Sequence, residues 1–231
     1  MNLLPRQIKT SSVAVRVLPF VLFLVLTALQ PALGVSGKFW IYLLKTVVGA
    51  WLLYEVWPFI PEMRWRSSLA AVGAGILVFL LWVGLAWILS KVGLNPRFAF
   101  LSVSGPAWNP KETFGASSFL AWFFVVVRIA GSTLVVPPLE EVFFRSFVYR
   151  YIKSPDFEKV PLGAFFPVPF VVTSVLFGFE HQEWLAGILC GFVYQGLVCW
   201  KKRLGDAMTA HAITNFLLGT YVVTQDAWKF W

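Results

Sequence analysis

Long apolar runs alternate with short polar segments along the 231 residues of the chain. A helix needs about 20 mostly apolar residues to cross about 30 Å of hydrocarbon. Runs of roughly that length predict membrane-spanning helices at residues 13–33, 39–58, 69–90, 118–136, 163–180, 185–200 and 206–223. The pattern therefore predicts an all-α fold, a polytopic transmembrane helix bundle with about seven spans (range six to eight).

The segment 91–117 interrupts this pattern with Pro, Gly, Ser and Asn, which are typical of a connection between helices. We expect it to lie on the outer side of the membrane. Its length allows an interfacial helix, because a structureless loop this long is unusual. It ends an N-terminal part, residues 1–115, which contains the first three spans. Residues 116–231 hold the remaining spans, and both parts form one continuous membrane domain.

The composition also indicates a membrane protein. Hydrophobic residues make up 58% of the chain and charged residues 13%, whereas an average soluble domain is about a quarter charged. The net charge of +8 comes from basic residues spread between the apolar runs. Because they form no compact basic face, we predict no nucleic-acid binding.

The same basic residues predict the orientation in the membrane. A cytoplasmic N-terminus puts 11 flanking Lys and Arg residues inside, among them Arg16 and Arg150, and 5 outside, which the positive-inside rule favours. Seven spans then put the C-terminus outside. The first span resembles a signal peptide, with basic residues before it and "PALG" after it, but its long apolar core indicates a retained helix. Cys190 and Cys199 lie on opposite sides of one helix, so we predict no disulfide between them.

Several ionisable residues fall inside or beside the spans. An ionisable group in the membrane costs at least a few kcal/mol, so it often marks a functional cavity. Lys45, Glu55 and Arg128 are isolated in sequence, and snorkelling, pairing or topology explains each of them. The others fall in three short clusters that contain candidate chemistry.

The first cluster is "EEVFFR", which begins at Glu140. On a helix Glu141 and Arg145 share a face, so the arginine can neutralise that carboxylate, while Glu140 projects about 100° away. Glu140 then has no partner within its own helix and is the candidate base. The alternative is that Glu141 and Arg145 form a buried ion pair that only fixes helix packing.

The other two clusters carry the histidines. In "FGFEH", Phe177 lies one turn before His181, and in "HAITN", His211 and Asn215 lie four residues apart on one helix face. An imidazole and a carboxamide can both donate hydrogen bonds to an oxyanion, although such a pair can also join helices in a membrane. At helical rise, Glu140 and Asn215 lie at similar depths of roughly 15 Å. His181 shares this layer if its helix starts close to Pro169.

The motifs EExxxR, FxxxH and HxxxN, in this order, resemble those of the CAAX-protease and bacteriocin-processing family of intramembrane glutamate proteases. The intervening segments "LEEVFFR", "VVTSVLFGFEH", "LAGILCGFVY" and "GDAMTAHAITNFLLG" are similar to it as well. The resemblance identifies residues 116–231 as a catalytic helix bundle of this type. Two positions depart from the family pattern: Ser146 stands where glycine is common, and Glu180 lies beside His181.

The resemblance implies an endopeptidase whose substrate is a membrane-bound peptide or a lipidated protein, and whose cleft opens to the cytoplasmic side. Glu140 and His181 would activate a water molecule, and Glu141 would assist. His211 and Asn215 would stabilise the oxyanion, while Arg145 and Phe177 would support the site. No cofactor is expected. We expect the protein in the bilayer of a prokaryotic inner (cell) membrane, and the sequence leaves its oligomeric state open.

Three alternatives remain. Two carboxylates and two histidines can hold zinc, although the chain has neither an HExxH motif nor a cysteine ligand set. The same fold can also serve as a non-catalytic scaffold, regulator or immunity protein. A proton-coupled transporter is the third, but no repeated pattern of broken helices supports it.

Overall fold

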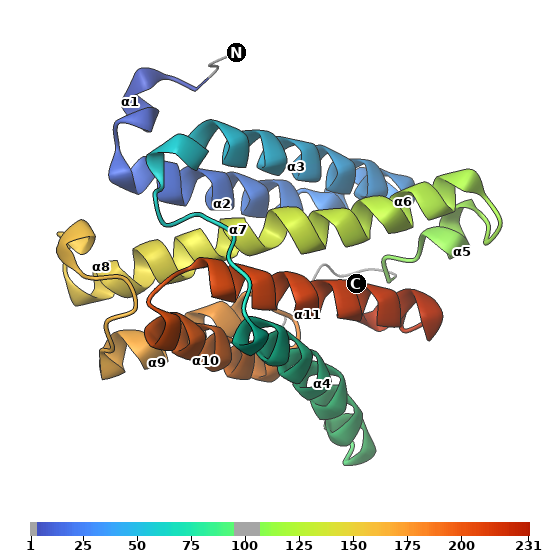
Figure 1. Cartoon of the computed structure of the whole chain (residues 1–231). Helices are drawn as coiled ribbons and strands as arrows, with labels where there is room; N and C mark the ends of the chain where they lie inside the picture. Colours follow the sequence, from blue (N-terminus) through green and yellow to red (C-terminus); the bar gives the residue numbers. More distant parts are fainter. Residues whose placement is uncertain (1–3, 95–106) are drawn as a thin grey trace.

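The computed structural model describes residues 4–94 and 107–231 (Figure 1). All regular elements in these ranges are helices, which confirms the predicted all-α fold. The first elements are α1 (Arg6–Lys9), α2 (Ser12–Ala28), η1 (Gln30–Leu33), α3 (Gly34–Val56), η2 (Trp57–Phe59), α4 (Leu69–Lys91) and α5 (Pro110–Phe114). They are followed by α6 (Phe119–Ala130), η3 (Gly131–Val135), α7 (Val136–Glu141), η4 (Val142–Val148), α8 (Tyr149–Lys153), η5 (Phe157–Lys159), α9 (Pro167–Phe179), α10 (Trp184–Lys201), α11 (Gly205–Thr224) and η6 (Trp228–Phe230).

A single helical rod of 35 residues, Phe119–Lys153, runs through the middle of the molecule. It consists of α6, η3, α7, η4 and α8, which follow one another without a break. The Ser118 hydroxyl starts it by accepting a hydrogen bond from the Leu120 N–H. η3 and η4 are π-helical, so the backbone widens on both sides of α7. The rod therefore includes the predicted span 118–136 and continues through the glutamate motif.

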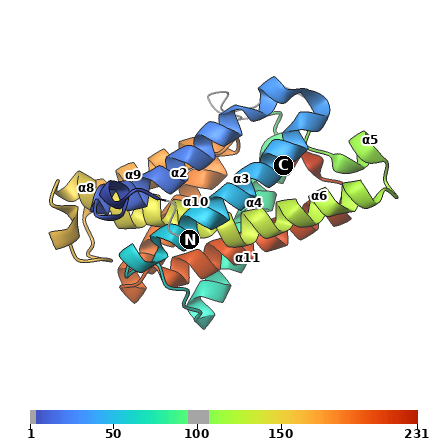
Figure 2. The same cartoon turned by 90° about the horizontal axis from the view of Figure 1, so that it is seen from above.

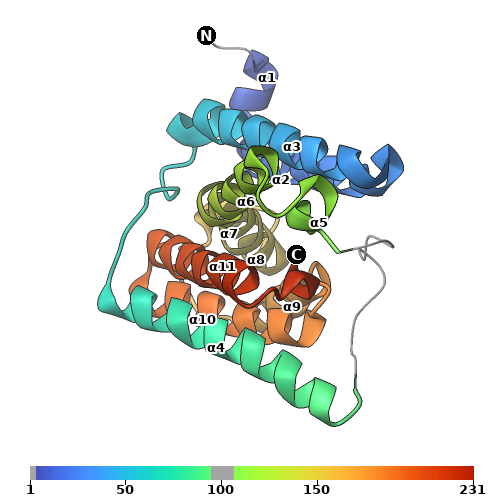
Figure 3. The same cartoon turned by 90° about the vertical axis from the view of Figure 1, so that its right-hand side faces the viewer.

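The other long helices cover the rod from two sides. Figure 3 looks along the rod, with α2 and α3 on one side and α11 on the other. α2 and α3 are joined by η1 into a hairpin, which Figure 2 shows from above. α4 and α10 pack against the far side of α11, and α9 packs against α10. This arrangement brings the motif residues of α7 and α11 close to those at the C-terminal end of α9.

Four helical stretches are long and apolar enough to cross a membrane: Gly34–Phe59, Leu69–Lys91, Phe119–Lys153 and Trp184–Lys201. The protein is accordingly an integral membrane protein. Helices occupy all seven predicted ranges. However, Ser12–Ala28 and Pro167–Phe179 are shorter apolar helices, and α11 is not among the four stretches, so the count of about seven spans is not confirmed.

The remaining predictions about the fold concern the connecting segment, the division of the chain, its orientation and its cysteines. The predicted outer-side segment 91–117 falls partly on residues 95–106, which lie outside the described part of the chain, and α5 forms near its end. The division at residue 115 and the orientation of the termini stay predictions. Cys190 and Cys199 are free, as predicted.

Small residues bring α4 against α11. A Cβ atom on Gly75 would lie 2.6 Å from the Ala210 carbonyl oxygen, which is closer than real Cβ atoms come to other atoms. At the start of both helices, the Ser68 hydroxyl donates to Asp206 and also accepts from the Ala71 N–H. α11, which carries His211 and Asn215, is therefore fixed to α4 by close backbone packing and by a capping contact.

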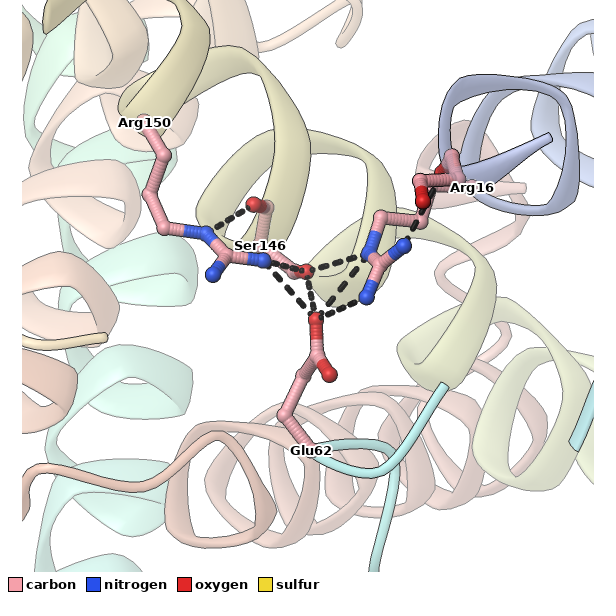
Figure 4. A network of polar contacts seen from close by, with 5 residues as sticks. Arg16, Glu62, Ser146 and Arg150 are labelled. Carbon is pink, nitrogen blue, oxygen red and sulfur yellow. Dashed lines mark hydrogen bonds and ion pairs between the residues drawn. The ribbon is translucent and has the colours of Figure 1, made fainter. Parts of the chain in front are cut away.

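A buried polar network fixes the other end of the rod (Figure 4). One Glu62 oxygen, from the α3–α4 connection, accepts from Arg16 on α2 at 2.8 Å and from Arg150 on α8 at 2.9 Å. The Ser146 hydroxyl donates to the same oxygen and accepts from Arg150 at 2.8 Å. Arg16 and Arg150, predicted as cytoplasmic flanks, are thus buried ion-pair partners. Ser146 fills the position of the expected glycine with a hydroxyl that this network uses.

We expect Gly75→Ala to lower stability by about 1–3 kcal/mol, because the added methyl group forces α4 away from α11. Gly73→Ala is the matched control, since a Cβ atom there meets nothing within 4 Å. Alanine is the better helix former, so the control is expected to be neutral or stabilising. Unfolding temperatures in detergent compare the two, and equal effects would contradict this packing.

Glu62→Gln should destabilise the protein at pH 7 by about 2 kcal/mol, because two arginines lose a charged acceptor. Burial alone would raise the pKa of Glu62, but the Arg16 charge and the Ser146 hydroxyl hold that pKa below its usual value. The stabilisation is therefore present above the unfolded pKa of about 4.3 and is lost as the pH falls through the lower folded pKa. The unfolding temperatures of wild type and variant, measured between about pH 3 and 8, should converge at the acid end. Exposed Glu158→Gln is the control, and a constant difference across the pH range would contradict the assignment.

Candidate active site

Four predicted site residues line one cavity of about 220 Å³: Glu140, His181, His211 and Asn215. They come from α7, from the residues just after α9, and from α11. The prediction that the three motifs share a layer of the membrane domain is therefore matched by the geometry. α9 starts at Pro167, close to the start at Pro169 that this layer required. Their catalytic roles stay predictions.

Glu141 lies behind the cavity and holds His211. Its Oε1 atom is 3.0 Å from His211 Nδ1, and its side chain is fully buried. A carboxylate accepts hydrogen bonds, so His211 Nδ1 carries a proton and donates to Glu141. His211 Nε2 then points the other way, 3.8 Å from Glu140 Oε2. The two adjacent glutamates thus contact opposite edges of one imidazole.

Arg145 balances the charge of Glu141, as the i, i+4 spacing predicts. Arg145 Nε lies 3.2 Å from Glu141 Oε2, an ion pair whose geometry is not that of a hydrogen bond. The guanidinium also stacks 4.0 Å over the ring of Phe177, which provides cation–π stabilisation in a buried place. Phe177 in turn contacts His181 and His211, with ring centroids 4.8 and 6.0 Å apart. Neither Arg145 nor Phe177 lines the cavity. Phe177 packs against both histidines, and Arg145 packs on the ring of Phe177.

Glu140 lines the cavity and has a carboxylate oxygen that accepts no hydrogen bond. The residue is 7% exposed, and its Oε2 atom is buried without a hydrogen-bond partner. A buried carboxylate oxygen in this state is costly and commonly marks a functional position. The expectation that Glu140 lacks a partner within its own helix agrees with this geometry.

The backbone fixes the tautomer of His181. Its Nδ1 atom lies 2.8 Å from the carbonyl oxygen of Phe177. Because a carbonyl oxygen can only accept, Nδ1 must donate, and the neutral imidazole keeps its lone pair on Nε2. The ring packs edge-to-face against Trp82 at 5.3 Å. His181 is thus held by the last turn of α9 with one nitrogen free to accept a proton.

The two prolines of the motif explain how Asn215 is held. In η3 the Val136 N–H bonds to the Gly131 carbonyl, five residues back. The next bond of this π pattern would join residue 137 to the Ser132 carbonyl, but Pro137 has no N–H. Asn215 Nδ2 instead donates to that carbonyl at 2.8 Å. Pro137 therefore leaves free a backbone acceptor that fixes the carboxamide of Asn215.

Several cavity residues lie outside the three motifs. Tyr194 of α10 stacks on His211 with ring centroids 5.1 Å apart and donates to Thr214 at 2.7 Å. Lys45 and Arg128, which looked isolated in sequence, also line the cavity. Their charge within apolar runs marked both residues as unusual, but no pattern in the sequence indicated that α3 and α6 lie side by side. Glu55 instead pairs with Lys9 at 2.7 Å, away from the site.

The cavity extends along the rod in one direction. Glu140, Val136, Ser132 and Arg128 line it at intervals of four residues, and Trp231 lies beside Arg128. This is the α6 end of the rod, opposite to α8. In the predicted orientation that end faces the outer side, whereas we expected the cleft to open to the cytoplasmic side. Among residues 4–94 and 107–231, no group of three or more His, Cys, Asp or Glu residues is placed to hold a metal ion.

Residues 118–217 match the family model described as "Type II CAAX prenyl endopeptidase Rce1-like". The family predicted from the three motifs is thereby confirmed over this part of the chain, which contains all of the predicted site residues. The match does not include α2, α3 or α4. No curated protein and no solved structure matches the chain.

Arg145→Met should destabilise the protein by about 3–5 kcal/mol, because it leaves the buried Glu141 carboxylate without its cation. The double variant Arg145→Met/Glu141→Gln should recover part of this loss, since no unpaired charge remains. Unfolding temperatures of the two single variants and the double variant measure the coupling. Strictly additive effects would show that the pair contributes nothing.

Proposed function

We propose that the protein is an intramembrane endopeptidase that hydrolyses a peptide bond in a membrane-associated or lipidated substrate. The observation that carries this proposal is the single cavity lined by Glu140, His181, His211 and Asn215. The match of residues 118–217 to a prenyl endopeptidase family supports the class of reaction. An apolar surrounding that excludes bulk water would strengthen each polar contact inside the site.

In the proposed mechanism Glu140 removes a proton from a water molecule, and His181 Nε2 accepts the second hydrogen bond of that water. The water oxygen attacks the peptide carbonyl carbon, and the carbonyl electrons form an oxyanion. Glu140 then passes the proton to the departing amine nitrogen as the C–N bond breaks. Removing a general base of this kind lowers rates by about 10²–10⁴-fold.

The oxyanion would be stabilised by His211 and Asn215. His211 Nδ1 faces the Glu141 carboxylate and Nε2 points toward the cavity, so a His211 side chain with a proton on both nitrogens donates through Nε2 to the oxyanion. Asn215 is fixed by its bond to the Ser132 carbonyl, so its carboxamide is oriented before substrate binds. A donor of this kind contributes about 10²–10³-fold in rate. Glu141 assists by orienting His211.

The proposal needs no metal ion or other cofactor. We further propose a prokaryotic inner membrane with a cytoplasmic N-terminus as its location, from the distribution of Lys and Arg. Zinc is the alternative that a chelator tests: activity of the purified protein should be unchanged by 1,10-phenanthroline.

Glu140→Gln should abolish cleavage, with a loss of at least about 100-fold, because the carboxamide cannot take a proton from water. Proteomic comparison of membranes from wild-type and variant cells should reveal uncut peptides that accumulate in the variant. Glu112→Gln, an exposed glutamate on α5, is the control and should resemble wild type.

His181→Ala provides a second test and should cause the same peptides to accumulate. A folded Glu140→Gln protein that leaves every membrane peptide unchanged would overturn the proposal. That result would favour a non-catalytic scaffold, regulator or immunity protein, in which the polar cluster only joins helices.

A further inference from the structure

The cavity has two chemically different ends. Glu140 and the two histidines line one end, and Lys45 and Arg128 line the other. Arg128 lies 12 residues before Glu140 on the same rod, which is roughly 18 Å at helical rise. A substrate that reaches Glu140 along this cavity therefore passes two cationic side chains.

Lys45 brings an ammonium group into this space from α3. The residue is 5% exposed, and Nζ donates to the Thr27 hydroxyl at 2.8 Å. The rings of Phe23 and Tyr42 lie 4.6 and 4.7 Å from Nζ. Within residues 4–94 and 107–231, no carboxylate lies within ion-pair distance of this nitrogen. An ammonium has three donors, so the group retains capacity for a ligand.

Arg128 places a guanidinium group against aromatic rings. Its Cζ atom lies 4.6 Å from the ring of Tyr42, 4.8 Å from Trp108 and 5.5 Å from Trp231. These rings hold the planar group without using its N–H donors. In the described part of the chain, the guanidinium forms neither a hydrogen bond nor an ion pair with another side chain. A guanidinium held flat in this way presents its fork of donors to a planar anion such as a carboxylate.

The charges that line the cavity are not balanced. With His181 and His211 counted as neutral, the formal charges of Lys45 and Arg128 contribute +2 and that of Glu140 contributes −1, which leaves +1. Two cations that share the ring of Tyr42 also repel each other. A buried charge without a partner is costly. A ligand with one negative charge offsets this cost and makes the cavity neutral.

We propose that Lys45 and Arg128 form a subsite that binds a carboxylate of the substrate peptide, either its chain end or an acidic side chain. The identification of the ligand as a substrate rests on the proposed function. The carboxylate anchors the peptide at the α6 end of the cavity, and the peptide bond to be cut lies between this anchor and Glu140. Arg128 lies within the family-matched residues 118–217 and Lys45 lies outside them, so the subsite combines a matched helix with one of this chain's N-terminal helices.

Binding of four amphiphilic probes to the full chain in phosphatidylcholine nanodiscs tests the subsite. The probes are dodecanoyl-Gly-Gly with a free acid, its C-terminal amide, dodecanoyl-Gly-Asp amide, and dodecyl phosphate. Tryptophan fluorescence reports binding, since Trp82 and Trp231 line the cavity. At least one carboxylate probe should bind ten- to hundredfold more tightly than the neutral amide, as expected for charge-assisted hydrogen bonds. The acid and the aspartyl probe distinguish a chain end from an acidic side chain.

Lys45→Met and Arg128→Gln should each remove about tenfold or more of the affinity for the carboxylate probe and leave that for the neutral amide unchanged. Lys91→Met, at the exposed end of α4, is the control and should change neither. Lys45→Met removes a buried charge and keeps the side-chain volume, so it is expected to fold. Unfolding temperatures are measured first, and if Arg128→Gln does not fold, the Lys45 variant decides.

Equal affinity of wild type for the acid, aspartyl and amide probes would overturn the inference, as would carboxylate preference that persists in Lys45→Met. Tightest binding of dodecyl phosphate would indicate a lipid-phosphate site instead. The binding assay needs no hydrolysis, so it separates the two proposals. Loss of cleavage in Glu140→Gln without carboxylate preference overturns the subsite alone. Carboxylate preference with unchanged cleavage in Glu140→Gln overturns the endopeptidase alone.

Discussion

The centre of this molecule depends on the contacts of one buried carboxylate, that of Glu141. It lies between Arg145 on its own rod and His211 on α11, at 3.2 and 3.0 Å. An ionised group in an apolar interior persists only when its partners are held firmly. Its charge therefore fixes the position of α11 relative to the rod. The same carboxylate positions the imidazole of His211. Phe177 packs against both partners of the carboxylate, Arg145 and His211.

Local spacing was enough to predict the parts of the site that lie within one helix. Glu141 and Arg145 are four residues apart, and the ion pair predicted from that spacing is present. Long apolar runs likewise predicted a helix in each of seven ranges. The number of membrane spans did not follow, because helix length depends on where a chain turns. Ser12–Ala28 ends before the end of its predicted run, 13–33, and Pro167–Phe179 starts after the beginning of its predicted run, 163–180.

Contacts between distant helices could not be read from the sequence. Lys45 and Arg128 looked like separate oddities, because no pattern within either helix says that α3 and α6 share the ring of Tyr42. The bond from Asn215 to Ser132 depends on a π turn that two prolines leave without a donor. Arg16 and Arg150 were predicted to flank membrane spans on the cytoplasmic side, yet both are buried and form ion pairs with Glu62. In each case the partner lies far along the chain, and only folding brings it close.

The cavity is built from two regions of the chain that differ in their relation to known proteins. α7, α9 and the first part of α11, which contains His211 and Asn215, fall within the family-matched residues. The α2–α3 hairpin, which supplies Phe23, Tyr42 and Lys45, does not. Under the proposed function, such a division lets substrate selectivity change while the residues proposed for catalysis stay the same. An exchange of the α2–α3 hairpin between relatives would then transfer substrate preference while the hydrolytic machinery stays the same. In that case the hairpin determines which substrates bind, and the family-matched helices carry out the proposed reaction.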